Sequence, residues 1–270
     1  MPLIIPSNSQ SSTGYSIDQS IRFNPSDSPY MQRTYGAGGN VDKWSLSFWF
    51  KRGRLTTQVA SDEMHIFGSG ANTNNTFDIQ FTQTDQIQIW DYHSAYRTRL
   101  LTNRLFRDPS AWYHFVFVYV TRLQTNRLFR DTSAWYHLVF VFDSGNAIST
   151  ERSKLYINGV RETSFASEVY PSQNADGIVG SNVNIGFGRY ISYGSKYFEG
   201  YLAEMNYVNG LALDPSSFGE YNDSGIWIPK EYSGSYGTGG FFVDGRDSAD
   251  LGDDESGNGN DLTTSGLAAD

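Results

Sequence analysis

Residues 98–120 read TRLLTNRLFRDPSAWYHFVFVYV, and residues 121–143 read TRLQTNRLFRDTSAWYHLVFVFD. The second block repeats the first directly behind it, with identical residues at 18 of the 23 paired positions. A repeat of fixed period is typical of solenoid proteins, but these need about three or more units to bury a continuous core. Two tandem copies therefore predict a local duplication inside a single fold.

Each copy predicts two strands joined by a turn. Arg-Leu-x-Thr-Asn is a short strand, and Arg-Asp-x-Ser-Ala is a tight turn whose aspartate caps the following backbone N–H groups. Trp-Tyr-His-x-Val-Phe-Val then forms a strong, nearly continuously apolar strand. We expect 135–142 to be the core strand, because the second copy leads directly into the strand predicted at 153–158. We expect 112–120 to lie at a sheet edge and to be covered by a neighbouring chain, since 115–120 is wholly apolar.

The rest of the chain shows the period-two alternation that indicates strands. Residues 44–50 predict a half-buried strand, and 65–67 predict a short strand that ends at the glycine-rich 68–70. Residues 77–81 and 86–92 flank a turn and predict a hairpin. Further elements are a hairpin of 153–158 with 160–165, strands at 182–188 and 198–209, and a helical turn at 214–218 capped by Asp214.

Composition supports an all-β fold. Aromatic residues make up 16% of the chain and charged residues only 18%, with 27 glycines for turns. No segment has helical periodicity over 12 or more residues, so the residues predict a sandwich or a barrel. The strand 198–209 alternates throughout, which predicts Tyr201, Ala203, Met205 and Tyr207 on one face.

The same composition excludes several classes of function. A formal net charge of −9 and a pI near 4.9 disfavour nucleic acid as a partner. The chain has no cysteine, which excludes disulfides and thiolate chemistry. We expect no signal peptide and no membrane insertion, because the N-terminus lacks a basic region and no apolar run approaches 18 residues.

Six segments together resemble one family. They are LSFWFKRG (46–53), RDTSAWYHLVFVFD (130–143), KLYINGV (154–160), FEGYLAEMNYVNGLALDPSSFGEY (198–221), IWIPKEYSGSYGTGGFF (226–242) and DESGNGNDLT (254–263). Over residues 20–263 the chain resembles the LamG-like, concanavalin A-like jelly-roll proteins of tailed-phage virions. That family has one copy of the Arg-Asp-x-Ser-Ala-Trp-Tyr-His block, and this chain has two.

The resemblance implies an antiparallel two-sheet jelly-roll sandwich that binds without turnover, in a tail fibre, tail tip or capsid decoration. It implies localisation in the virion, after assembly in the host bacterial cytoplasm, and host-surface glycan as a ligand. We expect a homo-oligomer, a trimer for a fibre, with other virion proteins bound through an extended arm at 1–19. The jelly roll would span 20–243, and the acidic, glycine-rich 244–270 would pack on the sandwich or leave it.

Two aromatic clusters are candidate ligand-binding sites, because aromatic faces stack on sugar rings. The first cluster ends the predicted hairpin, and the second lies in a loop rich in glycine and serine. The candidates are Trp90, Tyr92, His93 and Tyr96 in the first cluster, and Tyr190, Tyr193 and Tyr197 in the second. Ordinary packing of aromatic side chains is the alternative for both.

We expect no catalytic residues. A glucanase of this fold would carry acids alternating on one strand, and the sequence has no such run. Glu199 and Glu204 are five residues apart, which places them on opposite faces of a strand. The four histidines, His65, His93, His114 and His137, lack metal-ligand spacing and are interpreted as hydrogen-bonded structural residues.

No cofactor is expected, and Ca²⁺ is the one metal that the sequence leaves open. Five aspartates in the turn-rich tail offer hard oxygen ligands, although they do not match an EF-hand, and a solvated acidic loop is the alternative reading. They are Asp247, Asp250, Asp253, Asp254 and Asp261. Three functions follow: a virion attachment or structural protein, a stand-alone lectin-like module, and, as the weakest alternative, a glycoside hydrolase.

Overall fold

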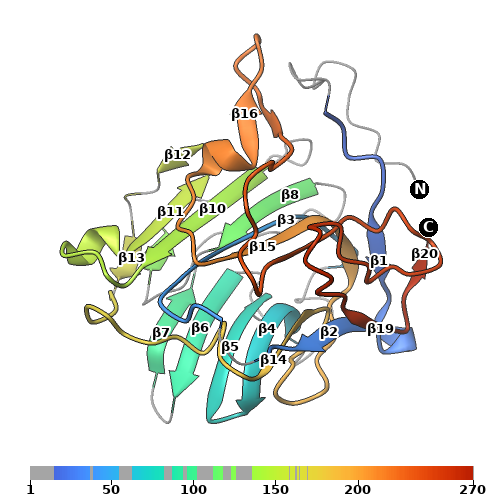
Figure 1. The fold of residues 1–270 in the computed structure, drawn as a ribbon, viewed down its shortest axis with the longest axis horizontal. Coiled ribbons are helices and arrows are strands. Elements are labelled where there is room, and N and C mark those ends of the chain that lie inside the picture. Colours follow the sequence, from blue (N-terminus) through green and yellow to red (C-terminus); the bar gives the residue numbers. More distant parts are fainter. Residues whose placement is uncertain are drawn as a thin grey trace.

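A computed structural model describes residues 15–36, 39–54, 63–81, 87–93, 96–101, 112–117, 123–125, 136–157, 159–161, 163, 165–168 and 170–269. Within these ranges two β-sheets pack face to face, with only short 3-10 turns beside them (Figure 1). The prediction of an all-β, antiparallel two-sheet sandwich is confirmed. Among the described residues, no helix has the length and apolar character needed to cross a membrane.

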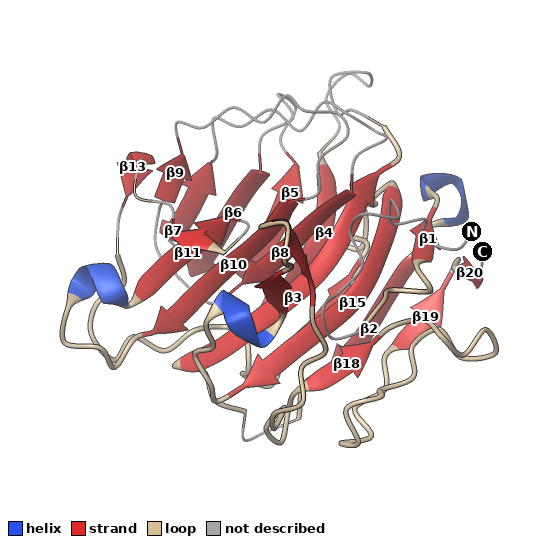
Figure 2. Cartoon of the chain, turned by 90° about the horizontal axis from the view of Figure 1, so that it is seen from above, coloured by secondary structure: helices blue, strands red, loops and turns tan. Residues whose placement is uncertain are grey.

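The larger sheet has nine strands in the described part of the chain. Figure 2 shows its central strands side by side. Their order is β12 (Val160–Arg161), β11 (Ser153–Ile157), β10 (Tyr136–Asp143), β8 (Trp112–Phe117), β3 (Lys43–Arg52), β15 (Gly200–Asn209), β1 (Ile21–Phe23) and β20 (Ala268–Ala269), with β18 (Phe241–Val243) also on β15.

The smaller sheet has seven strands within the described ranges. Consecutive segments of the chain cross repeatedly between the two sheets, as in a jelly roll. The strand order is β19 (Thr263–Ser265), β2 (Tyr30–Thr34), β14 (Asn184–Phe187), β4 (Met64–Asn72), β5 (Asn75–Phe81), β6 (Ile87–His93) and β7 (Tyr96–Leu101).

Four shorter strands and three turns complete the described elements. β9 (Leu123–Thr125) pairs with β13 (Phe165–Glu168), and β16 (Gly219–Tyr221) pairs with β17 (Trp227–Pro229). The 3-10 turns are η1 (Pro25–Asp27), η3 (Ser149–Glu151) and η4 (Pro215–Ser217). The predicted helical turn is thus present at η4, but Asp214 makes no side-chain capping hydrogen bond.

Aromatic rings fill the space between the sheets. Phe50 of β3 meets Phe81 of β5 with ring centroids 5.6 Å apart, and Trp44 meets Phe77 at 5.5 Å, both edge to face. Such contacts add about 1 kcal/mol per pair beyond the burial of their apolar area. The alternating aromatic residues of the sequence therefore build the core that holds the two sheets together.

The prediction that 44–50 is half-buried is wrong, because β3 is covered on both faces. Its alternate residues Trp44 to Phe50 face the core, while Trp49 faces outward. Ile17 of the N-terminal segment packs on Trp49, and both side chains are only 2% exposed. On the same outer face Ser45 Oγ donates a hydrogen bond to the carbonyl of Leu211. Segments distant in sequence therefore cover a face that the alternation alone leaves to solvent.

Two other strands depart from their predicted pattern. β4 does not stop after residue 67 but continues through Gly68, Ser69 and Gly70 to Asn72. In β15 the pairing with β3 shifts register between Ala203 and Asn206, and Glu204 adopts φ 51°. This bulge puts Ala203 on the outer face with Trp49, whereas Met205 lies in the core, so the predicted shared face is wrong.

The duplicated unit corrects the predicted edge position. β8, from the first copy, lies between β3 and β10 in the interior of the larger sheet. The second copy's β10 lies beside it, one strand farther from β3. The first copy is therefore not an edge strand, and the reason for expecting a neighbouring chain over it no longer holds. The predicted capping turns of both copies fall outside the described residues.

The two ends of the described chain pack on the sandwich. Tyr15 and Ile17 lie on the outer face of the larger sheet. At the other end β19 pairs with β2, and β20 pairs with β1. Of the two alternatives left open for the C-terminal segment, residues 244–269 follow the first and pack on the sandwich.

Candidate functional site

Three aromatic rings form a stack on the outer side of the smaller sheet. The buried imidazole of His65 stacks on Tyr190 with centroids 4.6 Å apart and an interplanar angle of 12°. Tyr190 in turn stacks on Tyr193, at 5.9 Å and 6°, and Trp90 meets Tyr190 edge-on at 5.8 Å. We call His65, Trp90, Tyr190 and Tyr193 the ring platform. Tyr193 is its outermost member and is 67% exposed.

A tight loop between β14 and β15 carries two of the platform rings. It closes on itself through a bridge between Tyr190 and Ser195 and a backbone hydrogen bond from Phe198 to Gly188. The loop is tied to β5, since Ser192 Oγ donates to Thr76 Oγ1 at 2.8 Å. It is tied to β4 as well, because the N–H of His65 donates to the carbonyl of Lys196.

Glycines of β4 form the floor on which this loop rests. A Cβ atom at Gly68 would lie 3.2 Å from Ile191, and one at Gly70 would lie 2.4 Å from Ser192 Oγ. Only residues without a side chain let the loop approach the sheet this closely. The glycines predicted to end a strand therefore continue it and position the platform.

A buried carboxyl group fixes the base of the ring stack. Asp78 of β5 is fully buried, and its Oδ1 lies 2.7 Å from Nδ1 of His65. Burial raises the pKa of Asp78 well above its usual range, and the nearby Glu63 raises it further. The bond sets the orientation of the imidazole, and therefore the plane on which Tyr190 stacks.

The structure brings together members of both predicted clusters. Trp90 from the hairpin meets Tyr190 from the loop, although 100 residues separate them in sequence. Tyr197 stays within its loop, where its hydroxyl donates to the carbonyl of Gly194. The side chains of Tyr92, His93 and Tyr96 lie outside the described residues, although the backbones of Tyr92 and Tyr96 are opposite each other. His65 was predicted as a structural histidine, and its hydrogen bond to Asp78 fits that role.

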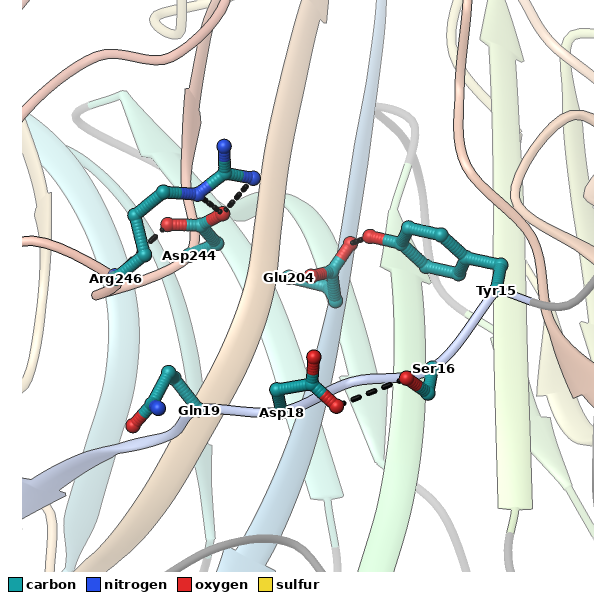
Figure 3. Close-up of a pocket in the computed structure, with 7 residues that line it drawn as sticks. All are labelled: Tyr15, Ser16, Asp18, Gln19, Glu204, Asp244 and Arg246. Atoms are coloured by element: carbon teal, nitrogen blue, oxygen red, sulfur yellow. Dashed lines mark hydrogen bonds and ion pairs between the residues drawn. The ribbon is translucent and has the colours of Figure 1, made fainter.

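A polar pocket of about 440 Å³ opens on the outer face of the larger sheet, near the N-terminal segment (Figure 3). The hydroxyl of Tyr15 donates to the carboxylate of Glu204, and Arg246 forms an ion pair with Asp244 at 2.5 Å. We call it the acidic pocket. Its lining residues are Tyr15, Ser16, Asp18, Gln19, Glu204, Asp244 and Arg246.

Glu204 has an unusual environment for a carboxyl group. The bulge in β15 places its side chain under Tyr15, and burial raises the pKa of Glu204 to about 7. The hydrogen bond from Tyr15 lowers this pKa, whereas the charge of Asp244 raises it. The alternation of 198–209 gives no sign of a bulge, so the sequence did not identify Glu204 as a special residue.

The aspartates of the C-terminal segment hold turns. Asp254 accepts from the N–H groups of Phe242, Ser256 and Asn260, and Asp247 accepts from that of Ala249. Among the residues that the structure describes, no group of three or more histidine, aspartate or glutamate side chains is placed to hold a metal ion. The backbone thus occupies the oxygens that the sequence offered for Ca²⁺.

No family model matches this chain. No curated protein sequence matches it. Among solved structures, it is similar to a SAP-like pentraxin from Limulus polyphemus, with 12% identity and a TM-score of 0.40 over 74% of this chain and 80% of that chain. It is similar to domains LG4-5 of the mouse laminin alpha1 chain, with 9% identity and a TM-score of 0.42 over 74% and 45%. It is also similar to the K499G mutant of the NanB sialidase from Streptococcus pneumoniae, with 15% identity and a TM-score of 0.36 over 77% and 29%.

Proposed function

We propose that this chain is a carbohydrate-binding jelly-roll module, and that the ring platform is its binding surface. The observation that carries the proposal is the position of Tyr193. Its ring is mostly exposed, yet it is held parallel to Tyr190, which is itself stacked on the buried His65. An exposed ring with a fixed orientation is what the apolar face of a sugar ring requires.

Pre-organisation strengthens this argument. A ligand that stacks on a mobile side chain must first order it, at about 0.5–1.5 kcal/mol per side chain. In the platform the loop closes through backbone hydrogen bonds and is tied to Thr76, so much of this ordering is complete before a ligand arrives. Trp90 adds a second aromatic surface at the edge of Tyr190.

The test is a glycan array with the full chain, with and without Ca²⁺, followed by calorimetry on a glycan that binds. Tyr193→Ala should weaken binding about tenfold, because an aromatic stacking contact contributes about 1 kcal/mol or slightly more. The matched control is Tyr221→Ala, which removes another exposed tyrosine, on β16. An array without binding, or equal affinities for the two variants, would contradict the proposal.

We further propose that binding occurs without hydrolysis. Glycosidases need two carboxyl groups that flank the scissile bond. The carboxyl group bonded to the platform is Asp78, which is fully buried behind His65 and faces no bound sugar. Incubation of the chain with a bound glycan should release no new reducing ends. Their appearance at a rate proportional to protein concentration would contradict this proposal.

We place this activity on a virion, on the motif resemblance described for residues 20–263. In that setting the module would be a homo-oligomeric fibre, tail-tip or decoration protein, assembled in the host bacterial cytoplasm and held to other virion proteins through the arm at 1–19. Mass spectrometry of purified particles tests the setting, and cross-linking gives the stoichiometry, expected to be three. Absence of the chain from intact particles would contradict the setting while leaving the glycan-binding test unaffected.

A further inference from the structure

The two copies of the duplicated unit lie against each other in equivalent positions. β8 and β10 pair in parallel, with Tyr113 opposite Tyr136 and His114 opposite His137. Each residue thus faces the residue 23 positions later, which is its own counterpart in the other copy. β8 and β10 are parallel neighbours in a sandwich whose other strand pairs are antiparallel in the described residues.

The leading strands of the two copies are also neighbours. Thr98 to Leu101 of the first copy lie in β7, at the edge of the smaller sheet. The equivalent part of the second copy contributes β9, which contacts β7 and pairs with β13. Each copy therefore runs from the side of the smaller sheet to the larger sheet, and the second copy repeats this path one strand farther along, as successive turns of a solenoid do.

The register against β3 connects the two copies. β8 lies antiparallel to β3 with Val116 opposite Ser47. β10 extends past the end of β8 and there pairs with β3 itself, with Phe142 opposite Trp44. Continuing this register back by three residues in each strand would place Val139 opposite Ser47. Val139 is the counterpart of Val116, so the two copies fit the same position beside β3 in one register.

We infer that the first copy is a removable unit, and that the sandwich accepts this segment only in whole units of 23 residues. Without one unit, β10 takes the position of β8 beside β3, and every side chain of the strand keeps its face. A deletion of any other odd or even length within the strand disturbs this, because a shift of one residue sends side chains to the opposite face. Each unit widens the larger sheet by one strand, about 4.8 Å, and so sets how far β11 and β12 lie from β3.

A pair of deletions tests the inference. Deletion of 116–138 removes 23 residues and joins Phe115 to Val139, which regenerates one intact copy. Deletion of 116–137 removes 22 residues and joins Phe115 to Leu138, which leaves one extra residue in the middle of the strand. We expect the first variant to fold cooperatively with a β-rich circular dichroism spectrum, and the second to melt at least about 5 °C lower. Failure of the first variant to fold, or equal melting of both, would overturn the inference.

Engineered disulfides locate the strands directly, since the chain has no native cysteine. In the full chain, Ser47→Cys should cross-link with Val116→Cys and not with Val139→Cys, whose strand lies two positions away, beyond the reach of a disulfide. In the chain lacking 116–138, Ser47→Cys should cross-link with Val139→Cys. The absence of that second cross-link in the folded deletion variant, measured on non-reducing gels and by mass spectrometry, would overturn the inference. Neither test depends on glycan binding.

Discussion

The pocket carboxyl Glu204 predicts that the protein loses stability as pH rises through neutrality. Its side chain is only 9% exposed, in a bulge of β15. Four groups face it from other segments: the phenol of Tyr15, the carboxylates of Asp244 and Glu231, and the guanidinium of Arg246. The carboxylates raise the pKa of Glu204 and the other two lower it, so the desolvation of the charged form dominates. Glu204→Gln removes this charge and keeps an oxygen that can accept from Tyr15.

The magnitude follows from the shift of the pKa. A rise from 4.5 to about 7 corresponds to about 3 kcal/mol, at 1.36 kcal/mol per unit. Because the pKa is raised in the folded state, the folded protein binds the proton more tightly than the unfolded chain. The stabilisation is therefore complete below about pH 4.5 and is lost as pH rises through about 7. Relative to Glu204→Gln, the wild-type chain should lose about 3 kcal/mol between pH 4.5 and pH 8.

Urea unfolding at several pH values measures this difference. The comparison of the two chains isolates Glu204, because the other titrating groups are common to both. Asp18→Asn is the matched control, since Asp18 lines the same pocket but is exposed. It should retain the pH dependence of the wild-type chain. A difference between wild type and Glu204→Gln that stays constant from pH 4.5 to pH 8 would refute the reasoning.

Three further predictions concern single contacts. Tyr15→Phe removes the hydrogen bond that lowers the pKa of Glu204, so the midpoint of the pH-dependent loss should move to higher pH in the same urea series. Gly186→Ala would place a Cβ 2.1 Å from the carbonyl oxygen of Met31 in the neighbouring strand, and should destabilise the fold by about 2 kcal/mol in urea unfolding. Asp254→Ala leaves three backbone N–H groups without their acceptor, and hydrogen exchange should show faster exchange at 242, 256 and 260, with 30–34 unchanged.

Sequence patterns located the strands well but not the environment of each face. The hairpin of β5 and β6 was predicted because alternating runs flank a turn, and the two strands pair along their whole length. β3 was predicted to be half-buried, since alternation describes one sheet and cannot show that Ile17 would cover Trp49. The bulge at Glu204 was missed for a related reason: a glutamate at φ 51° leaves no mark in a run that still alternates by residue type.

The candidate site was predicted in parts, and folding supplied the connection between them. Trp90 and Tyr190 were identified in two separate clusters, and only the packing of the loop on β4 brings them into contact. His65 was assigned a structural role on its lack of ligand spacing, which the bond to Asp78 supports. That same bond gives it a second role as the base of the ring stack, which spacing along the chain cannot show.

The duplicated unit shows why nearly identical segments need not have identical positions. Both copies have the residues to pair with β3, and β10 still does so at Phe142, beyond the end of β8. A sheet offers only one place directly beside β3 on that side, so the second copy must pair with the first. Parallel pairing in which each residue meets its counterpart then preserves the face of every side chain, and the apolar pattern that fits one strand beside β3 fits the next one as well. The sequence similarity of the two copies is therefore itself the reason that the larger sheet can hold both.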